Sequence, residues 1–354
     1  MMTESAVQDQ LEGYFARLGA SFQQVAGTVS PELFTRSLAG LTLRIQCSGP
    51  NFAQLLTRSL NHLPAVDPVQ PASLEIFAWD IAATGVPAPV PPWSWPAGTK
   101  EVRFVLPKGG EAFRLQVFEQ GALYILHSLV RQQVYCWTPD ARALPTYLHA
   151  SPLLSPLHWW ASSVGLNILH AGCVGTEEGA ALLAGPGGSG KSTTALLSAL
   201  EGLDYLSDDY SLVKLEPAPV AYCLYSSGKL HRNHLQRFPE LASRSLDPGP
   251  DRHEKPVIFM HEHFPGQVAT SRPLRAVLAP RVTGQPDTRL VPMPAAEALR
   301  ALAPSTLFQL PLEGSGNLRP MASLVRALPC YRLDLGTDLS QIPRTIRQLL
   351  ASQH

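Results

Sequence analysis

Residues Ala180 to Ala195 read Ala-Ala-Leu-Leu-Ala-Gly-Pro-Gly-Gly-Ser-Gly-Lys-Ser-Thr-Thr-Ala, an apolar run followed by a glycine-rich turn and a helical pattern. The apolar run over 180–184 predicts a buried strand, and the apolar spacing after the turn predicts a helix. A strand, the pattern G-x-x-x-x-G-K-S and a helix, in this order, are typical of a phosphate-binding loop. Glycines lack a Cβ, so backbone N–H groups can approach an anion, and the helix N-terminus adds partial positive charge.

The residues of this loop have different predicted tasks around a nucleoside triphosphate. Lys191 is expected to face solvent over the loop and to reach the β- and γ-phosphates, and the Ser192 hydroxyl is expected to hold Mg²⁺. The loop therefore predicts ATP and Mg²⁺ as cofactors. The other residues predicted to bind the nucleotide are Gly185, Gly187, Gly188, Ser189, Gly190 and Thr193.

Two other interpretations fit part of the loop pattern. Gly185 to Gly190 also matches G-x-G-x-x-G, the dinucleotide fingerprint, for which Asp208 would be the acidic residue that contacts a ribose. A purely structural glycine turn is the second alternative. Lys191 and Ser192 favour the triphosphate site, because a dinucleotide loop has no use for a lysine at this position.

The chain of 354 residues is long enough for two domains, and its 45% hydrophobic and 16% charged residues permit a sizeable core. Lys and Arg number 28 together, as do Asp and Glu, so no net basic charge indicates a nucleic-acid partner.

Five scattered cysteines without a C-x-x-C pair suit a reducing compartment and argue against a zinc site. Because the chain has no run of 18 apolar residues, we expect a cytoplasmic protein without a membrane partner. A homo-oligomer is compatible with the sequence.

Residues 1–150 are predicted to form a smaller, β-rich α+β domain. An apolar stripe over 5–25 predicts an amphipathic helix, and the alternation over Leu41–Cys47 predicts a half-buried strand. Substrate recognition is a candidate role for this domain. Further strand-like segments indicate a mostly antiparallel sheet, namely Ser73–Trp79, Val102–Leu106, Phe113–Phe118, Ala122–His127 and Gln133–Trp137.

Residues 151–354 are predicted to form an α/β domain around the glycine-rich loop. An apolar run through Ile168–Val174 and a turn at Glu177–Gly179 lead into the strand before the loop. After the loop helix, a short strand ends at Ser207. The remaining predicted elements are strands over 219–225, 275–278, 289–292 and 330–335, and helices over 294–302 and 339–350.

Asp208 and Asp209, at the carboxyl end of that short strand, are candidates for acid–base and metal chemistry. One carboxylate is expected to accept the proton of an attacking hydroxyl, and the other to help hold Mg²⁺. Two adjacent carboxylates repel each other unless a cation lies beside them, which gives Mg²⁺ a reason to bind there. The alternative is a solvated turn, because Ser-Asp-Asp-Tyr by itself is a common sequence.

Two further residues are candidates for the same site. His170 lies at the end of an apolar run beside the loop strand, although a lone histidine more often has a structural role. Lys255 is a candidate for a second cation on the transferring phosphate, and a solvated loop is the alternative for its segment.

Leu169-His170-Ala171, the loop Gly-Pro-Gly-Gly-Ser-Gly-Lys-Ser-Thr and Leu206-Ser207-Asp208-Asp209, in this order, resemble the catalytic domain of HPr kinase/phosphorylase. The wider relatives include HPr-kinase-like serine kinases of peptide-modifying gene clusters, such as lasso peptide kinases. The resemblance covers about residues 160–350. It implies a phosphoenolpyruvate-carboxykinase-like variant of the P-loop fold, with Asp208 as the base, Asp209 at Mg²⁺ and His170 lining the phosphate pocket.

The sequence also departs from HPr kinase. Tyr210 stands where HPr kinase has an arginine directly after the aspartate pair. Residues 1–150 do not match its N-terminal domain, and the signature related to phosphorolysis has no counterpart. The resemblance therefore implies neither phosphorylase activity nor an HPr substrate.

The leading hypothesis is an ATP- and Mg²⁺-dependent kinase that phosphorylates a hydroxyl of a serine in a peptide or protein. Free serine or another small alcohol is the alternative acceptor. A nucleotide-binding regulatory ATPase, in which the first domain senses a signal, is the alternative of a different class.

Overall fold

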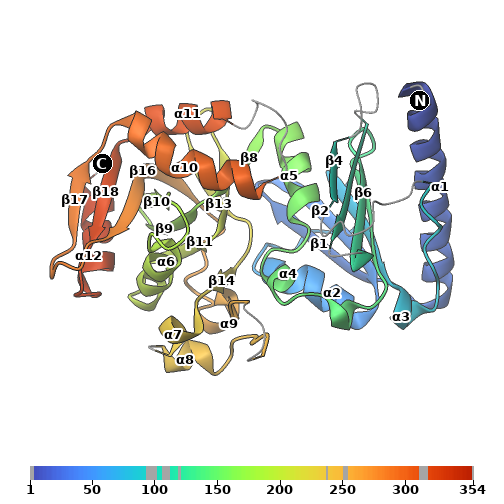
Figure 1. The fold of residues 1–354 in the computed structure, drawn as a ribbon, viewed down its shortest axis with the longest axis horizontal. Helices are drawn as coiled ribbons and strands as arrows, with labels where there is room; N and C mark the ends of the chain where they lie inside the picture. The colour runs from blue at the N-terminus through green and yellow to red at the C-terminus, as the bar shows by residue number, and fades with distance from the viewer. Residues whose placement is uncertain are drawn as a thin grey trace. The chain divides into compact units, whose positions relative to one another are not determined.

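The computed structural model describes residues 4–92, 102–105, 112–118, 121–236, 238–249, 254–310 and 318–352. Two compact units make up the chain, and Figure 1 labels their elements. No helix in the described ranges is long and apolar enough to cross a membrane. Unit 1 comprises Met1–Arg58, Leu63–Leu148 and Pro152–Trp160, and unit 2 comprises Ser59–His62, His149–Ser151 and Ala161–His354.

Unit 1 is built on a seven-stranded sheet with the order β1-β2-β3-β7-β6-β5-β4. Four neighbouring pairs are antiparallel, whereas β3 runs parallel to both β2 and β7. The prediction of a mostly antiparallel sheet is confirmed, but the sequence pattern missed β1. The strands are β1 (Glu32–Leu38), β2 (Leu41–Ser48), β3 (Leu74–Asp80), β4 (Val102–Val105), β5 (Phe113–Phe118), β6 (Leu123–Ser128) and β7 (Gln133–Thr138).

Helix α1 (Glu4–Thr28) packs its apolar stripe on the sheet of unit 1, and the helix predicted over 5–25 is thereby confirmed. Leu11, Leu18 and Phe22 are buried in this contact. The ring centroids of Phe15 and Tyr135 lie 4.7 Å apart in an edge-to-face arrangement, which is favourable for aromatic pairs. The other helices before residue 164 are α2 (Pro50–Thr57), α3 (Ile81–Thr84), α4 (Tyr147–Ala150) and α5 (Leu154–Ser163).

Unit 2 is built on a nine-stranded sheet with the main order β11-β9-β10-β16-β13-β12-β8. Beside this path, β18 pairs with both β16 and β17. β16 runs parallel to β10 and to β18, and the other pairs of this sheet are antiparallel. The strands are β8 (Leu166–His170), β9 (Gly172–Thr176), β10 (Gly179–Leu183), β11 (Asp204–Ser207), β12 (Tyr210–Lys214), β13 (Val220–Cys223), β16 (Ser271–Val282), β17 (Arg289–Pro292) and β18 (Cys330–Leu335).

Alternating side chains of β10 pack into two separate cores. Ala181 and Leu183 belong to a core that includes α6 and α12, whereas Ala180 and Leu182 belong to a core that includes α10 and α11. A strand buried on both faces needs a continuous apolar sequence, which is why the alternation of a half-exposed strand is absent here. The helices are α6 (Lys191–Leu200), α10 (Ala295–Gln309), α11 (Leu318–Ala327) and α12 (Gln341–Ala351).

Two long segments of unit 2 pair side by side, and their backbone pairing is interrupted at the same place. β8 leads directly into β9, and β11 leads into β12 through residues 208–209. Ser207 lies opposite Cys173 and Tyr210 opposite His170, and the register of β11 against β9 shifts between Tyr205 and Ser207. The two aspartates therefore lie at a bend between paired strands.

A small two-stranded sheet of unit 2 lies apart from the large one (Figure 1). It consists of β14 (Ser227–Lys229) and β15 (Val257–Phe259), which pair antiparallel. Three short helices accompany it in the chain, α7 (Arg232–Leu235), α8 (Pro239–Ala242) and α9 (Met260–His263).

Candidate active site

The predicted strand, loop and helix are confirmed: residues 184–190 connect β10 to the N-terminus of α6. Gly188 and Gly190 have φ angles of 81° and 107°, in the left-handed region that favours glycine. A Cβ at Gly190 would lie 2.5 Å from Leu335 Cδ1, so a side chain does not fit where the helix begins. The first N–H groups of an α-helix have no acceptor within the helix, and here they follow a turn that is open to an anion.

Lys191, the first residue of α6, is buried. Only 6% of its surface is exposed, and its Nζ donates to the carbonyl oxygens of Gly185 at 2.6 Å and Pro186 at 3.1 Å. The prediction of a solvent-facing lysine is therefore wrong, because the ammonium finds acceptors in the loop's own backbone. Burial lowers the pKa of Lys191, against the opposing effect of the charges on Asp209 and Asp208. Both aspartates thus lie within electrostatic reach of the loop lysine.

Serine side chains shape the backbone around the aspartate pair. The hydroxyls of Ser207 and Ser211 both donate to the carbonyl oxygen of Ala171, at 3.2 and 2.9 Å. The Ser207 hydroxyl also accepts the backbone N–H of Asp209 at 3.2 Å. These bonds take the place of the interrupted strand pairing, so the chain bends without leaving these buried backbone groups unsatisfied.

Asp208 is buried at this bend, with 2% of its surface exposed, so the segment is not a solvated turn. Its Oδ2 accepts the backbone N–H of Lys229 at 2.9 Å. The Tyr205 hydroxyl, which donates to the Ser227 carbonyl oxygen at 2.7 Å, lies 3.5 Å from Asp208 Oδ1. Burial, followed by the charge of Asp209, raises the pKa of Asp208 to about 6. Asp208 is therefore a stronger base than an exposed aspartate.

Asp209 is held between His170 and Lys229. Its Oδ1 accepts the Nε2–H of His170 at 2.7 Å, and its Oδ2 accepts the ammonium of Lys229 at 2.6 Å. Burial pushes the pKa of Asp209 upward, but Lys229 and His170 outweigh burial and hold this pKa well below its usual range. His170 is itself fixed, because its backbone N–H donates to the Thr306 hydroxyl at 3.1 Å. Asp209 is therefore a permanent anion with two partners.

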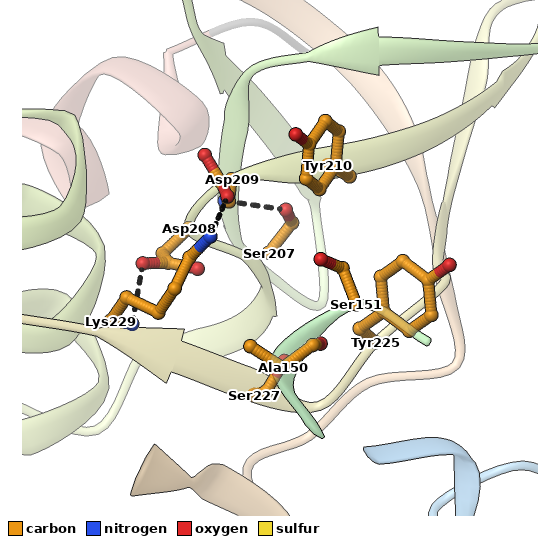
Figure 2. Close-up of a pocket in the computed structure, with 9 residues that line it drawn as sticks. All are labelled: Ala150, Ser151, Ser207, Asp208, Asp209, Tyr210, Tyr225, Ser227 and Lys229. Atoms are coloured by element: carbon orange, nitrogen blue, oxygen red, sulfur yellow. Dashed lines mark hydrogen bonds and ion pairs between the residues drawn. The ribbon is translucent and has the colours of Figure 1, made fainter. Parts of the chain in front are cut away.

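Lys229 is a residue of the site that the sequence analysis did not predict. It ends β14, and Figure 2 shows its side chain extending to Asp209. Burial lowers the pKa of Lys229, but Asp209 and then Tyr210 outweigh burial and raise this pKa above its ordinary value. In the sequence, Lys229 begins a basic stretch over 229–237 that has the composition of a solvated surface. No motif at this position could have identified it.

A small pocket opens beside the aspartate pair. Figure 2 shows the side chains around it, which come from the bend, from β14 and from the short segment at Ala150 and Ser151. Most of these side chains are polar, and several carry hydroxyl groups. The lining residues are Ala150, Ser151, Ser207, Asp208, Asp209, Tyr210, Tyr225, Ser227 and Lys229.

Two other predicted residues also lie near the aspartates or the loop lysine. Ser192 follows Lys191 at the start of α6, and it opposes the rise that burial causes in the pKa of Asp208. α6 and the bend both adjoin Gly228, where a Cβ would lie 3.2 Å from Leu196 Cδ2 and 3.9 Å from Asp208 Cγ. Lys255 is half-buried, and its charge contributes to the lowered pKa of Lys191. The structure thus brings Lys255 toward the loop, although it records no hydrogen bond of the Lys255 ammonium to a described residue.

The residues present fit a magnesium ion that is held mainly by phosphate oxygens. The Ser192 hydroxyl and the carboxylates of Asp208 and Asp209 are hard oxygen donors, which Mg²⁺ prefers. Within the described ranges, no group of three or more His, Cys, Asp and Glu side chains could hold a metal ion. Mg²⁺ typically uses one or two carboxylates together with substrate phosphates, so this donor set suits an ion that arrives with a nucleotide.

No protein-family model matches this chain, and no curated protein matches it. Among solved structures, the Hpr(Ser) kinase/phosphatase from Coxiella burnetii is similar to the chain, with a TM-score of 0.31 and 12% sequence identity. The similarity covers 52% of this chain and 88% of that protein. A likeness this distant carries no functional argument, so function has to be inferred from the residues of the site.

Proposed function

We propose that this protein is an ATP- and Mg²⁺-dependent kinase that transfers the γ-phosphoryl group to a hydroxyl, in particular to a serine of a peptide or protein. One observation carries the proposal: the end of β10, where the loop begins, and the bend with the aspartates both adjoin Gly172, because a Cβ there would lie 3.3 Å from Leu183 Cδ1 and 3.3 Å from the carbonyl oxygen of Asp208. A triphosphate cradle and a buried carboxylate base beside it are the parts that phosphoryl transfer to a hydroxyl requires. We assign unit 2 to the phosphoenolpyruvate-carboxykinase-like variant of the P-loop fold, as in HPr-kinase-like serine kinases.

In the proposed reaction, Asp208 accepts the proton of the acceptor hydroxyl while the hydroxyl oxygen forms a bond to the γ-phosphorus. The bond from the γ-phosphorus to the bridging oxygen breaks, and its electron pair leaves with the β-phosphate of ADP. Lys191 exchanges its contacts with Gly185 and Pro186 for phosphate oxygens and stabilises their charge. Ser192 and Asp209 would hold Mg²⁺, which neutralises phosphate charge when it is bound.

The pocket beside Asp208 is the proposed place of the acceptor. Its lining is polar and includes the hydroxyl groups of Ser151, Ser207 and Ser227 beside the two aspartates. A serine side chain of a peptide, or a small alcohol such as free serine, would bring its hydroxyl to Asp208 from this pocket. Both acceptor classes present the same hydroxyl to the same base.

Incubation with γ-labelled ATP and Mg²⁺ tests the proposed function with two matched acceptor pairs. A library of serine-containing peptides is compared with the same peptides carrying alanine, and free serine is compared with free alanine. Label on a serine compound and not on its alanine partner supports the kinase and identifies the acceptor class. Release of labelled phosphate alone, unchanged by any acceptor, contradicts the kinase and supports a regulatory ATPase. Absence of ATP turnover contradicts both functions.

A further inference from the structure

Backbone contacts fix Lys229 beside the aspartates. Its N–H donates to Asp208 Oδ2 at 2.9 Å, while β14 is paired with β15. The preceding Gly228 packs closely against the loop helix, because a Cβ there would lie 3.2 Å from Leu196 Cδ2 and 3.9 Å from Asp208 Cγ. The glycine therefore lets β14 approach both α6 and the bend, and it sets the position from which the Lys229 side chain extends.

The ammonium of Lys229 retains donor capacity for a ligand. An ammonium has three N–H donors, and Asp209 Oδ2, at 2.6 Å, is the acceptor that the structure records for it among the described residues. The side chain is 21% exposed and lines the pocket beside Asp208. Its nearest other recorded contact is with the face of Tyr210, 5.9 Å from the ring centroid, which uses no N–H donor. The remaining donors are therefore available on the pocket side.

The negative charges of the aspartate pair favour a cation beside a phosphoryl group that approaches the base. Asp208 and Asp209 are adjacent carboxylates, and both repel the negatively charged oxygens of a phosphoryl group that approaches the base. Lys191 supplies positive charge from the loop, where its Nζ donates to the carbonyl oxygens of Gly185 and Pro186. Among the described residues, Lys229 forms an ion pair with Asp209, so it offsets this repulsion beside the aspartate pair.

We propose that Lys229 is a catalytic residue of the phosphoryl transfer, held by Asp209 and donating from its ammonium to an oxygen of the transferred phosphoryl group. This role rests on the kinase function proposed above. With Lys229 added, the same bonds form and break, and the proton still goes to Asp208. Lys229 stabilises the charge of the phosphoryl oxygens during transfer. Asp209 is then the residue that positions Lys229.

Binding of ADP with Mg²⁺ and aluminium fluoride, an anionic mimic of the transferred phosphoryl group, tests this role without any acceptor. Calorimetry compares the affinity for Mg²⁺–ADP in the presence and absence of aluminium fluoride. In Lys229→Met, the gain in affinity that aluminium fluoride gives is expected to be at least about tenfold smaller than in the wild type. The affinity of this variant for ADP alone is expected to stay within about twofold of the wild-type value. Lys229→Arg is expected to retain most of the gain. Lys214→Met, at an exposed position, is the matched control and is expected to equal the wild type.

A second variant separates contact with the phosphoryl group from simple neutralisation of Asp209. Lys229→Met combined with Asp209→Asn removes one positive and one negative charge and leaves the net charge unchanged, so it also serves where the single variant fails to fold. Because Asp209 is also a proposed ligand of Mg²⁺, Asp209→Asn alone at saturating Mg²⁺ is the reference. If Lys229 only balances Asp209, the double variant shows the same aluminium-fluoride effect as Asp209→Asn, and the proposed role is overturned. If Lys229 contacts the phosphoryl group, the effect is at least about tenfold smaller in the double variant than in Asp209→Asn.

The same measurements distinguish a failure of the proposed kinase function from a failure of the proposed role of Lys229. A wild-type protein that does not bind Mg²⁺–ADP contradicts the kinase function itself. A wild-type protein that shows the aluminium-fluoride effect, together with a folded Lys229→Met variant that shows it undiminished, leaves the kinase intact and overturns the role of Lys229.

Discussion

Asp208 and Asp209 are neighbours in the chain, yet their carboxylates have opposite electrostatic surroundings. Burial and the adjacent negative charge raise the pKa of Asp208, whereas Lys229 and His170 hold the pKa of Asp209 low despite its burial. Two titratable groups whose pKa values are pushed apart in this way can divide the tasks of base and anion between them. At the scale of single residues, this difference supports Asp208 as the base of the proposed reaction.

Asp208→Asn is expected to lower the rate of transfer by about 10²–10⁴-fold, because the amide cannot accept the proton. Affinity for ATP should change little, since the loop holds the phosphates. Comparison of kcat with the nucleotide dissociation constant checks this expectation. If the loss appears mainly in nucleotide binding, Asp208 is not the base.

Asp209→Asn is expected to raise the Mg²⁺ concentration needed for activity, with partial rescue at high Mg²⁺. It should also lower the melting temperature, because Lys229 loses the carboxylate that balances its buried charge. A Mg²⁺ titration of both aspartate variants measures the first effect. Rescue of Asp208→Asn by Mg²⁺, without rescue of Asp209→Asn, would show that the two roles are reversed.

Lys191→Met is expected to reduce phosphoryl transfer by about 10²–10³-fold, as removal of one charge-stabilising donor does in other enzymes. The stem of methionine is similar in length and apolar, so the buried position should remain filled. The exposed Lys214→Met again provides a matched control. Turnover of the Lys191 variant near the wild-type level would contradict the role of the loop.

At the scale of elements, the turn between β10 and α6 depends on glycines for a local and a non-local reason. The φ angles of Gly188 and Gly190 favour glycine by local geometry. The closeness of Gly190 to Leu335, on β18, comes from the packing of the loop against a strand that is far away in the chain. Both constraints act at the N-terminus of α6, the proposed phosphate site.

Gly190→Ala is expected to destabilise the protein by about 1–3 kcal/mol, because alanine is strained at this φ angle and its Cβ meets Leu335. Gly187→Ala is the control, since no atom lies within 4 Å of a Cβ placed there, and its effect should be about 0.5 kcal/mol or less. Urea denaturation of both variants measures the difference. Equal stability of the two variants would contradict the packing of the loop against β18.

At the scale of the whole molecule, each unit contains a histidine whose pKa is lowered by burial; His127 in unit 1 is fully buried and His62 in unit 2 is half-buried. Burial lowers the pKa of His127 from 6.5 to about 3, and that of His62 from 6.5 to about 4. In the unfolded chain these histidines bind protons below pH 6.5, whereas in the folded chain they do not until the pH is lower. Their contribution to stability therefore falls as the pH decreases from 6.5 toward 4.

His127→Gln is expected to make the free energy of unfolding less dependent on pH between 6.5 and 4, because one of the two groups no longer titrates. Above pH 6.5 the slope should be unchanged. Urea denaturation at several pH values measures it, with His231→Gln, at an exposed position, as the control. The same acid slope in His127→Gln and the wild type would contradict the burial of a neutral His127.

The sequence alone determined the parts of the molecule whose causes are local. The apolar run at 180–184, the glycines of the turn and the helical spacing after it specify strand, loop and helix within one short stretch. The strand that ends at Ser207 places the aspartate pair for the same kind of reason. β1 was missed because its side chains fit no strict alternation and its pairing with β2 stabilises it. α2 was missed because it has only eight residues, so its apolar stripe of Phe52, Leu55 and Leu56 spans about two turns.

Only the tertiary structure decided which side chains meet the aspartates and in what charge state. Lys229 reaches Asp209 because β14, a strand of the small sheet, packs against the loop helix through Gly228, and no spacing in the chain encodes that approach. The burial of Lys191 likewise depends on where the carbonyl groups of Gly185 and Pro186 point. Motifs fix residue types and local backbone, whereas the pKa of a carboxylate depends on distances and burial that arise only when remote segments pack together.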